Sequence, residues 1–97
     1  MKKCKTLEEV RVEIDKIDDK LVELIAERSH YIHQAAGFKN SVDEVKALER
    51  VEFIKQRVRA KAIELNISPN LMSDLFSIMI NEMVEIEISQ FRNTTNF

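Results

Sequence analysis

Hydrophobic residues in the first part of the chain recur at alternating steps of three and four positions, which is typical of one face of an α-helix. The pattern begins at Thr6, and Glu9 three positions later completes the form of a capping box. Nothing interrupts it before Gly37. If the helix runs from Thr6 to about Lys39, it is roughly 50 Å long at about 1.5 Å per residue. The sequence leaves open whether it continues through Gly37. Its hydrophobic positions are Leu7, Val10, Ile14, Ile17, Leu21, Leu24, Tyr31, Ala35 and Phe38.

Two further helices are predicted in the rest of the chain. Ser41 and Glu44 form a second capping box before the second helix. Ser68 and Pro69 then indicate a stop and a new start, with Ser68 as N-cap and Pro69 at the first helical position. We expect residues 92–97 to form a frayed tail. The hydrophobic positions are Val45, Leu48, Val51, Ile54, Val58 and Leu65 in the second helix, and Met72, Leu75, Phe76, Met79, Ile80, Met83, Val84, Ile86 and Phe91 in the third.

Composition also favours an all-α fold. The 97 residues include one Gly and one Pro, fewer than strands joined by tight turns require. Hydrophobic residues make up 44% and charged residues 33%, which excludes a disordered or membrane-embedded chain. The length predicts a single domain, residues 1–97, with three helices of which the first is long.

The net charge and the cysteine content indicate which partners the chain can bind and in which compartment it works. The net charge of −2 provides no basic surface for nucleic acid. Cys4 is alone, which excludes an internal disulfide and fits a reducing compartment. No hydrophobic run is long enough to cross a membrane, and residues 1–5 lack the hydrophobic stretch that follows in a secretory signal. We therefore expect a cytoplasmic protein that binds neither nucleic acid nor membranes.

The hydrophobic face of the first helix is longer than either of the other helices can cover. A long uncovered face on a small protein usually means a partner, and the simplest partner is a second copy of the chain. The periodicity therefore predicts a homodimer.

Two cations lie on or near this hydrophobic face. Arg28 occupies a position between Leu24 and Tyr31, where a cation is costly unless something pairs with it. Lys39 lies eleven positions on, about three turns and roughly 16 Å, so the two side chains could hold one small dianion. Taken alone, Arg28 has a simpler explanation, either a long side chain that reaches solvent or a buried ion pair. The simpler explanation for Lys39 is that it lies past a helix end at Gly37.

Three more charged residues extend this candidate site. Arg11 lies about 25 Å from Arg28 along the helix, so it could reach the same ligand only from an antiparallel partner chain. Glu87 falls within the hydrophobic stripe of the third helix, and Glu49 lies early in the second helix, where it could face the same cavity. Individually, Arg11 could be a surface residue and Glu87 could simply pair with a nearby cation.

Other kinds of site are poorly supported. His30 and His33 are three positions apart but lack a clear third metal ligand. The chain has no Gly-rich phosphate loop, no paired cysteines and no nucleophile with an accompanying base. We therefore expect no metal and no cofactor.

The cations of the first helix belong to a sequence pattern known from one protein family. The resemblance to that family extends from about Leu7 to Phe91. The N-terminal helix is similar to that of the all-helical chorismate mutases. The segment from Tyr31 to Lys39, followed by Glu49 to Val51, resembles in particular the branch that includes isochorismate pyruvate-lyase. The residues that carry the resemblance are Arg11, Ile14, Asp15, Ile17, Asp18, Leu21, Arg28 and Lys39.

The resemblance implies an intertwined homodimer of three-helix chains with two active sites. Arg11 from the partner chain, Arg28 and Lys39 would hold the carboxylates and ether oxygen of the substrate, chorismate or isochorismate. Glu49 would contact the ring hydroxyl, and Glu87 stands where many members have a glutamine that contacts the ether oxygen. Such an enzyme rearranges chorismate to prephenate, and the lyase branch releases pyruvate from isochorismate to give salicylate.

Several positions depart from the common mutase pattern. Leu48 replaces a carboxylate-binding arginine, for which Arg50 is a candidate substitute, while Val45 replaces an aspartate and Met83 a serine. These changes raise the lyase as an alternative activity. A non-catalytic helical dimer is a third reading, favoured by Leu48 and Glu87.

Overall fold

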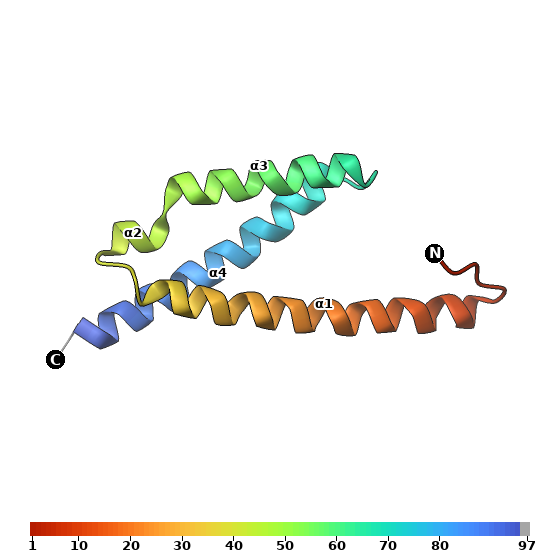
Figure 1. Cartoon of the computed structure of the whole chain (residues 1–97), viewed down its shortest axis with the longest axis horizontal. Helices are drawn as coiled ribbons and strands as arrows, with labels where there is room; N and C mark the ends of the chain where they lie inside the picture. Colours follow the sequence, from red (N-terminus) through yellow and green to blue (C-terminus); the bar gives the residue numbers. More distant parts are fainter. Residues whose placement is uncertain (96–97) are drawn as a thin grey trace. The chain divides into compact units, whose positions relative to one another are not determined.

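The computed structural model describes residues 1–95, without the side chains of Val45, Phe91 and residues 93–95. This part of the chain contains four helices and no strand, which confirms the predicted all-α class (Figure 1). The helices are α1 (Leu7–Ala36), α2 (Val42–Lys46), α3 (Leu48–Glu64) and α4 (Pro69–Thr95). The chain forms two compact units, which divide between Ile32 and His33 within α1.

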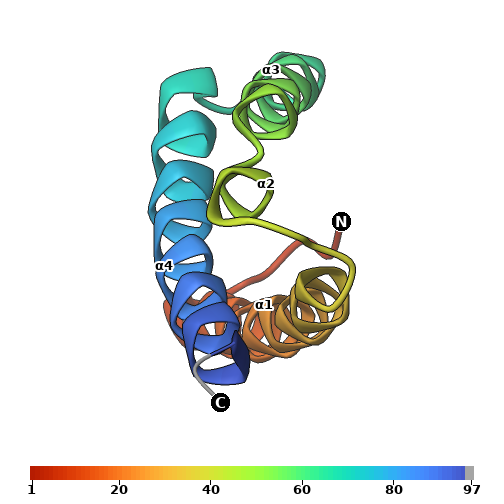
Figure 2. The same ribbon diagram turned by 90° about the vertical axis from the view of Figure 1, so that its left-hand side faces the viewer.

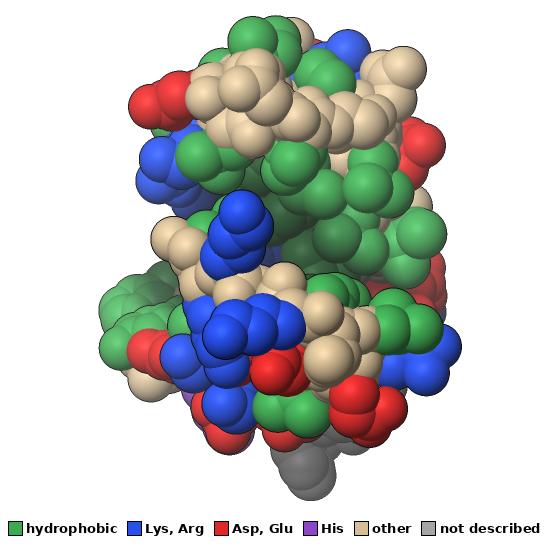
Figure 3. All heavy atoms as spheres, turned by 90° about the vertical axis from the view of Figure 1, so that its right-hand side faces the viewer, with side chains coloured by type: hydrophobic (Ala, Val, Ile, Leu, Met, Phe, Trp, Pro, Cys, Tyr) green, Lys and Arg blue, Asp and Glu red, His purple; other side chains and the backbone are tan. Residues whose placement is uncertain are grey.

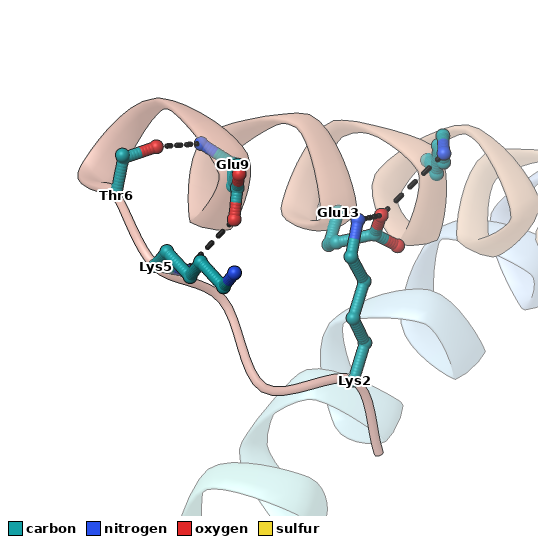
Figure 4. Close-up of polar contacts among 6 residues, drawn as sticks. Lys2, Lys5, Thr6, Glu9 and Glu13 are labelled. Carbon is teal, nitrogen blue, oxygen red and sulfur yellow. Dashed lines mark hydrogen bonds and ion pairs between the residues drawn. The ribbon is translucent and has the colours of Figure 1, made fainter.

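The N-terminus of α1 is fixed by the predicted capping box. The Thr6 hydroxyl accepts a hydrogen bond from the Glu9 amide at 3.1 Å, and the Glu9 carboxylate accepts one from the Lys5 amide at 2.8 Å (Figure 4). The segment before the helix also folds back, because Lys2 Nζ lies 3.4 Å from a carboxylate oxygen of Glu13. The first of these contacts satisfies the Glu9 amide, which an uncapped helix leaves without a partner.

The other two predicted N-caps are confirmed as well. The Ser41 hydroxyl accepts from the Glu44 amide at 3.1 Å at the start of α2. The Ser68 hydroxyl accepts from the Leu71 amide at 3.1 Å, with Pro69 as the first residue of α4. Each cap depends on residues three positions apart, so the local sequence is enough to determine it.

The second unit is built around a helical hairpin. Helices α3 and α4 pack against each other and diverge away from the turn that joins them, and α2 lies against α4 (Figures 1 and 2). Ala62 on α3 and Ile80 on α4 are buried in this unit. The turn has Asn66 in the left-handed conformation, and the amides of Ile67 and Asn66 donate to the carbonyls of Ala62 and Ile63. This Schellman arrangement closes the end of α3.

The structure decides where the first helix ends, which the sequence left open at Gly37. Helix α1 ends at Ala36 and not near Lys39. The amides of Gly37, Phe38 and Lys39 each donate to the carbonyl three residues earlier, which tightens the chain into a turn. A Cβ on Gly37 would lie 3.3 Å from the Gln34 carbonyl oxygen, so this turn is tight.

The second predicted helix is divided in two. Ala47 has φ 42° and ψ 58°, a left-handed conformation, and separates α2 from α3. For a residue other than glycine this conformation costs about 1–2 kcal/mol. Nothing in the sequence signals such a break, because alanine is the best helix former.

The third predicted helix is longer than expected. The backbone of α4 continues to Thr95, so the expectation of a frayed tail from Arg92 is wrong for residues 92–95. The expected contribution of Phe91 to the hydrophobic stripe lies outside the described side chains, and the rest of the expected tail, residues 96–97, lies outside the described residues.

The hydrophobic face of α1 is open to solvent within the chain. Helix α1 has no buried residue, and Ile17, Leu24 and Tyr31 are each at least 60% exposed. Figure 3 shows further hydrophobic side chains at the surface on one side of the molecule. The α1 face is an unusually large hydrophobic surface for a chain of this size.

None of the helices among the described residues combines the length and hydrophobicity that a membrane span needs.

Replacing Ala47 by Gly is expected to stabilise the chain by about 0.5–1 kcal/mol, because glycine adopts the left-handed conformation without a steric cost. Urea unfolding at one fixed protein concentration measures the change. Ala60→Gly, at an exposed position inside α3, is the matched control and is expected to destabilise by about 0.5–1 kcal/mol. Equal losses in both variants would contradict the assigned conformation of Ala47.

Candidate active site

The candidate site residues are divided between the two units. Arg11 and Arg28 belong to the first unit, and Lys39, Glu49 and Glu87 belong to the second. Arg11 is exposed and Arg28 is half-buried. Because α1 is one continuous helix between them, these two arginines are about 25 Å apart along its axis. One small ligand cannot contact both arginines of the same chain.

Lys39 lies in the loop between α1 and α2. The prediction that it shares a helix face with Arg28 is wrong, because α1 ends three residues before it. Its ammonium group instead donates a hydrogen bond to the Glu44 carbonyl at 3.0 Å, and the Glu44 carboxylate accepts from the Asn40 amide. The local fold of the loop, and not helical periodicity, therefore positions this cation.

A pocket opens beside Lys39. It has a volume of about 440 Å³, within the range of roughly 300–1,000 Å³ that small-molecule sites occupy. Arg50 stands at its margin, with its guanidinium carbon 5.2 Å from the centre of the Phe53 ring. The residues that line the pocket are Lys39, Glu44, Ala47, Leu48, Glu49 and Arg50. The lining places two cations beside two carboxyl-bearing side chains.

The left-handed Ala47 contributes to this pocket. It lies directly between α2, which supplies Glu44, and α3, whose first residues are Leu48, Glu49 and Arg50. A regular helix through this point would continue the direction of α2. The break is therefore the local feature that sets the start of α3 beside the Lys39 loop.

Glu87 is the most unusual titratable residue in the second unit. It lies on α4 with only 5% of its surface exposed, two turns after the buried Ile80. Burial raises the pKa of the Glu87 carboxyl, and the positive charges of Lys39 and His33 partly oppose that rise. The net shift is upward, so this carboxyl takes up a proton more readily than an ordinary glutamate.

His33 is a neighbour of Glu87 that sequence reasoning did not assign to the site. Its Nδ1 lies 3.1 Å from the side-chain oxygen of Gln90, one turn after Glu87 on α4. The sequence showed His33 only as half of an incomplete metal pair with His30. Among the described residues no group of three potential ligands is arranged to hold a metal ion. A contact between residues 57 positions apart leaves no signal in the local sequence.

The positions that depart from the common mutase pattern have different surroundings. Leu48 is 76% exposed and lines the pocket. The position of the usual arginine is therefore occupied by a leucine, but Arg50, two residues later, also lines the pocket. Met83 is half-buried on α4. The side chain of Val45 lies outside the described residues.

Comparison with known proteins identifies the family. Residues 10–88 match the family model described as chorismate mutase type II. The chain belongs to this family. A chorismate mutase from Methanocaldococcus jannaschii is 32% identical over 91 residues, which cover 93% of this chain and 92% of the relative. The range matched to chorismate mutase type II includes all five candidate residues, Arg11, Arg28, Lys39, Glu49 and Glu87.

The comparisons do not support the lyase branch. Both the family model and the relative are described as chorismate mutases. The resemblance of residues 31–39 and 49–51 to the lyase branch therefore stays a prediction from the sequence.

Replacing Glu87 by Gln is expected to stabilise the chain at pH 7.5 and not at pH 4. Folding raises the pKa of this carboxyl above its ordinary value of 4.5, so the folded state resists ionisation. Wild-type stability therefore falls as pH rises from about 4.5 through the folded pKa, whereas a glutamine has no charge to lose.

Urea unfolding of both proteins across this pH range measures the difference. Glu85→Gln, at an exposed position of the same helix, is the matched control and should show no comparable pH-dependent gain. A constant difference between wild type and Glu87→Gln at every pH would contradict the upward shift.

Proposed function

We propose that this member of the chorismate mutase type II family rearranges chorismate to prephenate. The observation that supports the proposal most directly is the family match, which spans all five residues of the candidate site. The pocket beside Lys39 adds support, because Lys39 and Arg50 are available there for substrate carboxylates and Glu49 for a hydroxyl. The relative from Methanocaldococcus jannaschii is itself described as a chorismate mutase.

The reaction suits a site made of fixed charges. Chorismate rearranges by a pericyclic shift, so no nucleophile is required. The enzyme has to hold a compact conformer in which the reacting ends are close. It also has to stabilise the negative charge that develops on the enolpyruvyl oxygen as its bond to the ring stretches.

The proposed roles follow from these two requirements. Arg28 and Arg11 of the partner chain bind the substrate carboxylates, and Glu49 binds the ring hydroxyl. Lys39 and Glu87 contact the ether oxygen. An ionised Glu87 would repel the developing charge, whereas a protonated Glu87 donates a hydrogen bond to it. For an ordinary glutamate, protonation at pH 7 costs about 3.7 kcal/mol. Burial of Glu87 reduces this cost.

The proposed assembly is a homodimer in which each site takes Arg11 from the other chain. Two features support it. The hydrophobic face of α1 is exposed within the chain, and each large side chain that a partner buries contributes about 1.5–3 kcal/mol. The spacing of Arg11 and Arg28 along α1 also prevents both from serving one site within one chain.

Purified protein incubated with chorismate is expected to give prephenate, identified by chromatography. Arg28→Ala should lower kcat/KM by about 100- to 1,000-fold or more, because it removes a charged contact to the substrate. Arg50→Ala should mainly raise KM if Arg50 supplies the cation that Leu48 does not.

A parallel incubation with isochorismate tests for salicylate and pyruvate. No turnover of either substrate would contradict the proposal and favour a non-catalytic dimer.

Activity is expected to rise toward acidic pH, because the protonated form of Glu87 is the one that assists. Glu87→Gln should flatten the profile, since an amide donates the same hydrogen bond at every pH. Initial rates between pH 5 and pH 8 measure both profiles. A flat wild-type profile would exclude this role for Glu87 without excluding mutase activity.

Mixing two inactive variants tests the exchange of Arg11. Arg11→Ala and Arg28→Ala dimers are each expected to be inactive, but a mixed dimer retains one site with both arginines. Co-refolding equal amounts should therefore restore about one quarter of wild-type activity, since half of the dimers are mixed and each has one intact site. Absence of recovery, with mixed dimers shown by mass spectrometry, would contradict the donation of Arg11 across the dimer.

A further inference from the structure

The short helix α2 holds the ammonium group of Lys39 beside the pocket. Lys39 Nζ donates a hydrogen bond to the carbonyl of Glu44 at 3.0 Å. In a longer helix this carbonyl would accept from the amide four residues later, but α2 ends at Lys46 and Ala47 is left-handed. The Glu44 carbonyl is therefore one of the terminal carbonyls that a helix leaves without an intrahelical amide. A lysine suits it well, because cations are favoured at the C-terminal end of a helix.

The position of this carbonyl depends on the capping box at the start of α2. The Ser41 hydroxyl accepts a hydrogen bond from the Glu44 amide at 3.1 Å, and the Glu44 carboxylate accepts one from the Asn40 amide at 2.6 Å. The amide, the carboxylate and the carbonyl of Glu44 are thus all bonded to residues 39–41. A helix of five residues is too short to be stable by itself, so its geometry depends on contacts such as these.

Lys39 is well placed to donate to a ligand while it is held in this way. It is half-buried, and it lines the pocket together with Glu49 and Arg50. An ammonium has three donors, of which the Glu44 carbonyl takes one, so the group can be fixed and still donate to a ligand. Donors that are fixed in advance stabilise developing charge best, because they need no reorganisation during the reaction.

We propose that Ser41 and Glu44 are positioning residues, whose capping box fixes the first turn of α2 so that the Glu44 carbonyl holds Lys39 at the pocket. Neither residue has to touch the substrate for this effect. The hold on Lys39 follows from contacts within the second unit. Its consequence for the rate rests on the proposed function, in which Lys39 contacts the ether oxygen.

Ser41→Ala tests the proposal through the rate of chorismate rearrangement. Loss of an N-cap shifts the equilibrium between an ordered and an unravelled helix end by roughly five- to tenfold, so kcat should fall by up to about that factor. KM should change little, because Lys39 acts on charge that develops in the transition state. Ser41→Thr keeps a capping hydroxyl and should retain most of the activity. Glu44→Ala removes the other half of the box and should act in the same direction as Ser41→Ala.

Ser68→Ala is the matched control. The Ser68 hydroxyl accepts from the Leu71 amide at 3.1 Å at the start of α4, and both serines are exposed. Thermal unfolding at one fixed protein concentration should show a loss of stability in both alanine variants, but only Ser41→Ala should lose kcat. An equal fall of kcat in both variants, or no fall in Ser41→Ala that circular dichroism shows to be folded, would overturn the proposal.

The Lys39 ammonium gives a second readout, which needs no substrate. A hydrogen bond slows the exchange of ammonium protons with water, so the proton–nitrogen NMR signal of Lys39 should be sharp in wild type and in Ser68→Ala. It should broaden in Ser41→Ala, and its loss in Lys39→Gln assigns it. A fall of kcat with an unchanged Lys39 signal would overturn the proposal, because the effect would not pass through Lys39.

The two readouts separate this proposal from the proposed function. If the protein turns over no chorismate, the proposed function fails, while the Lys39 signal still decides whether Ser41 positions this lysine. If turnover is normal but neither kcat nor the Lys39 signal changes in folded Ser41→Ala, only the role of the capping box fails.

Discussion

The hydrophobic face of α1 is the constraint on which the rest of the molecule depends. This helix takes up almost a third of the chain and has no buried residue of its own. A stable protein cannot leave such a surface in water, because exposed hydrophobic area opposes solubility and contributes nothing to stability. The proposed dimer resolves this by making each α1 part of a core shared by two chains. Dimer formation would also place Arg11 beside a ligand bound mainly by the partner chain, which Arg11 cannot reach within its own chain.

The chemistry of the site depends on a second balance, between the burial of Glu87 and the charges around it. Burial favours the neutral acid, whereas Lys39 and His33 favour the carboxylate. A glutamine at this position would need no such balance. A glutamate makes the hydrogen-bond donor conditional on pH, so the packing of α4 and the loop that holds Lys39 would influence the proposed reaction as directly as the substrate contacts do.

The sequence predicted the features that depend on neighbouring residues. All three N-caps were found, because each requires a hydroxyl and an amide three positions apart. The burial of Glu87 was also expected, since it falls in the hydrophobic stripe of its helix. Periodicity alone extends the first helix past Gly37, where the chain in fact forms a tight turn. It also failed at Ala47, where a left-handed alanine ends regular helix without a sequence signal. It also gave no indication of the contact between His33 and Gln90, which depends on how separate helices pack.

The unbroken course of α1 from Leu7 to Ala36 has a consequence for how this protein can change during evolution. A rigid helix fixes both the axial distance and the angle about the helix axis between Arg11 and Arg28. One inserted residue between them would turn one arginine by about 100° about the helix axis relative to the other. A seven-residue insertion would nearly preserve that angle but would increase the distance between the two arginines by about 10 Å. Point substitutions at the polar positions of α1 are thus far easier to accommodate than an insertion or deletion between Arg11 and Arg28.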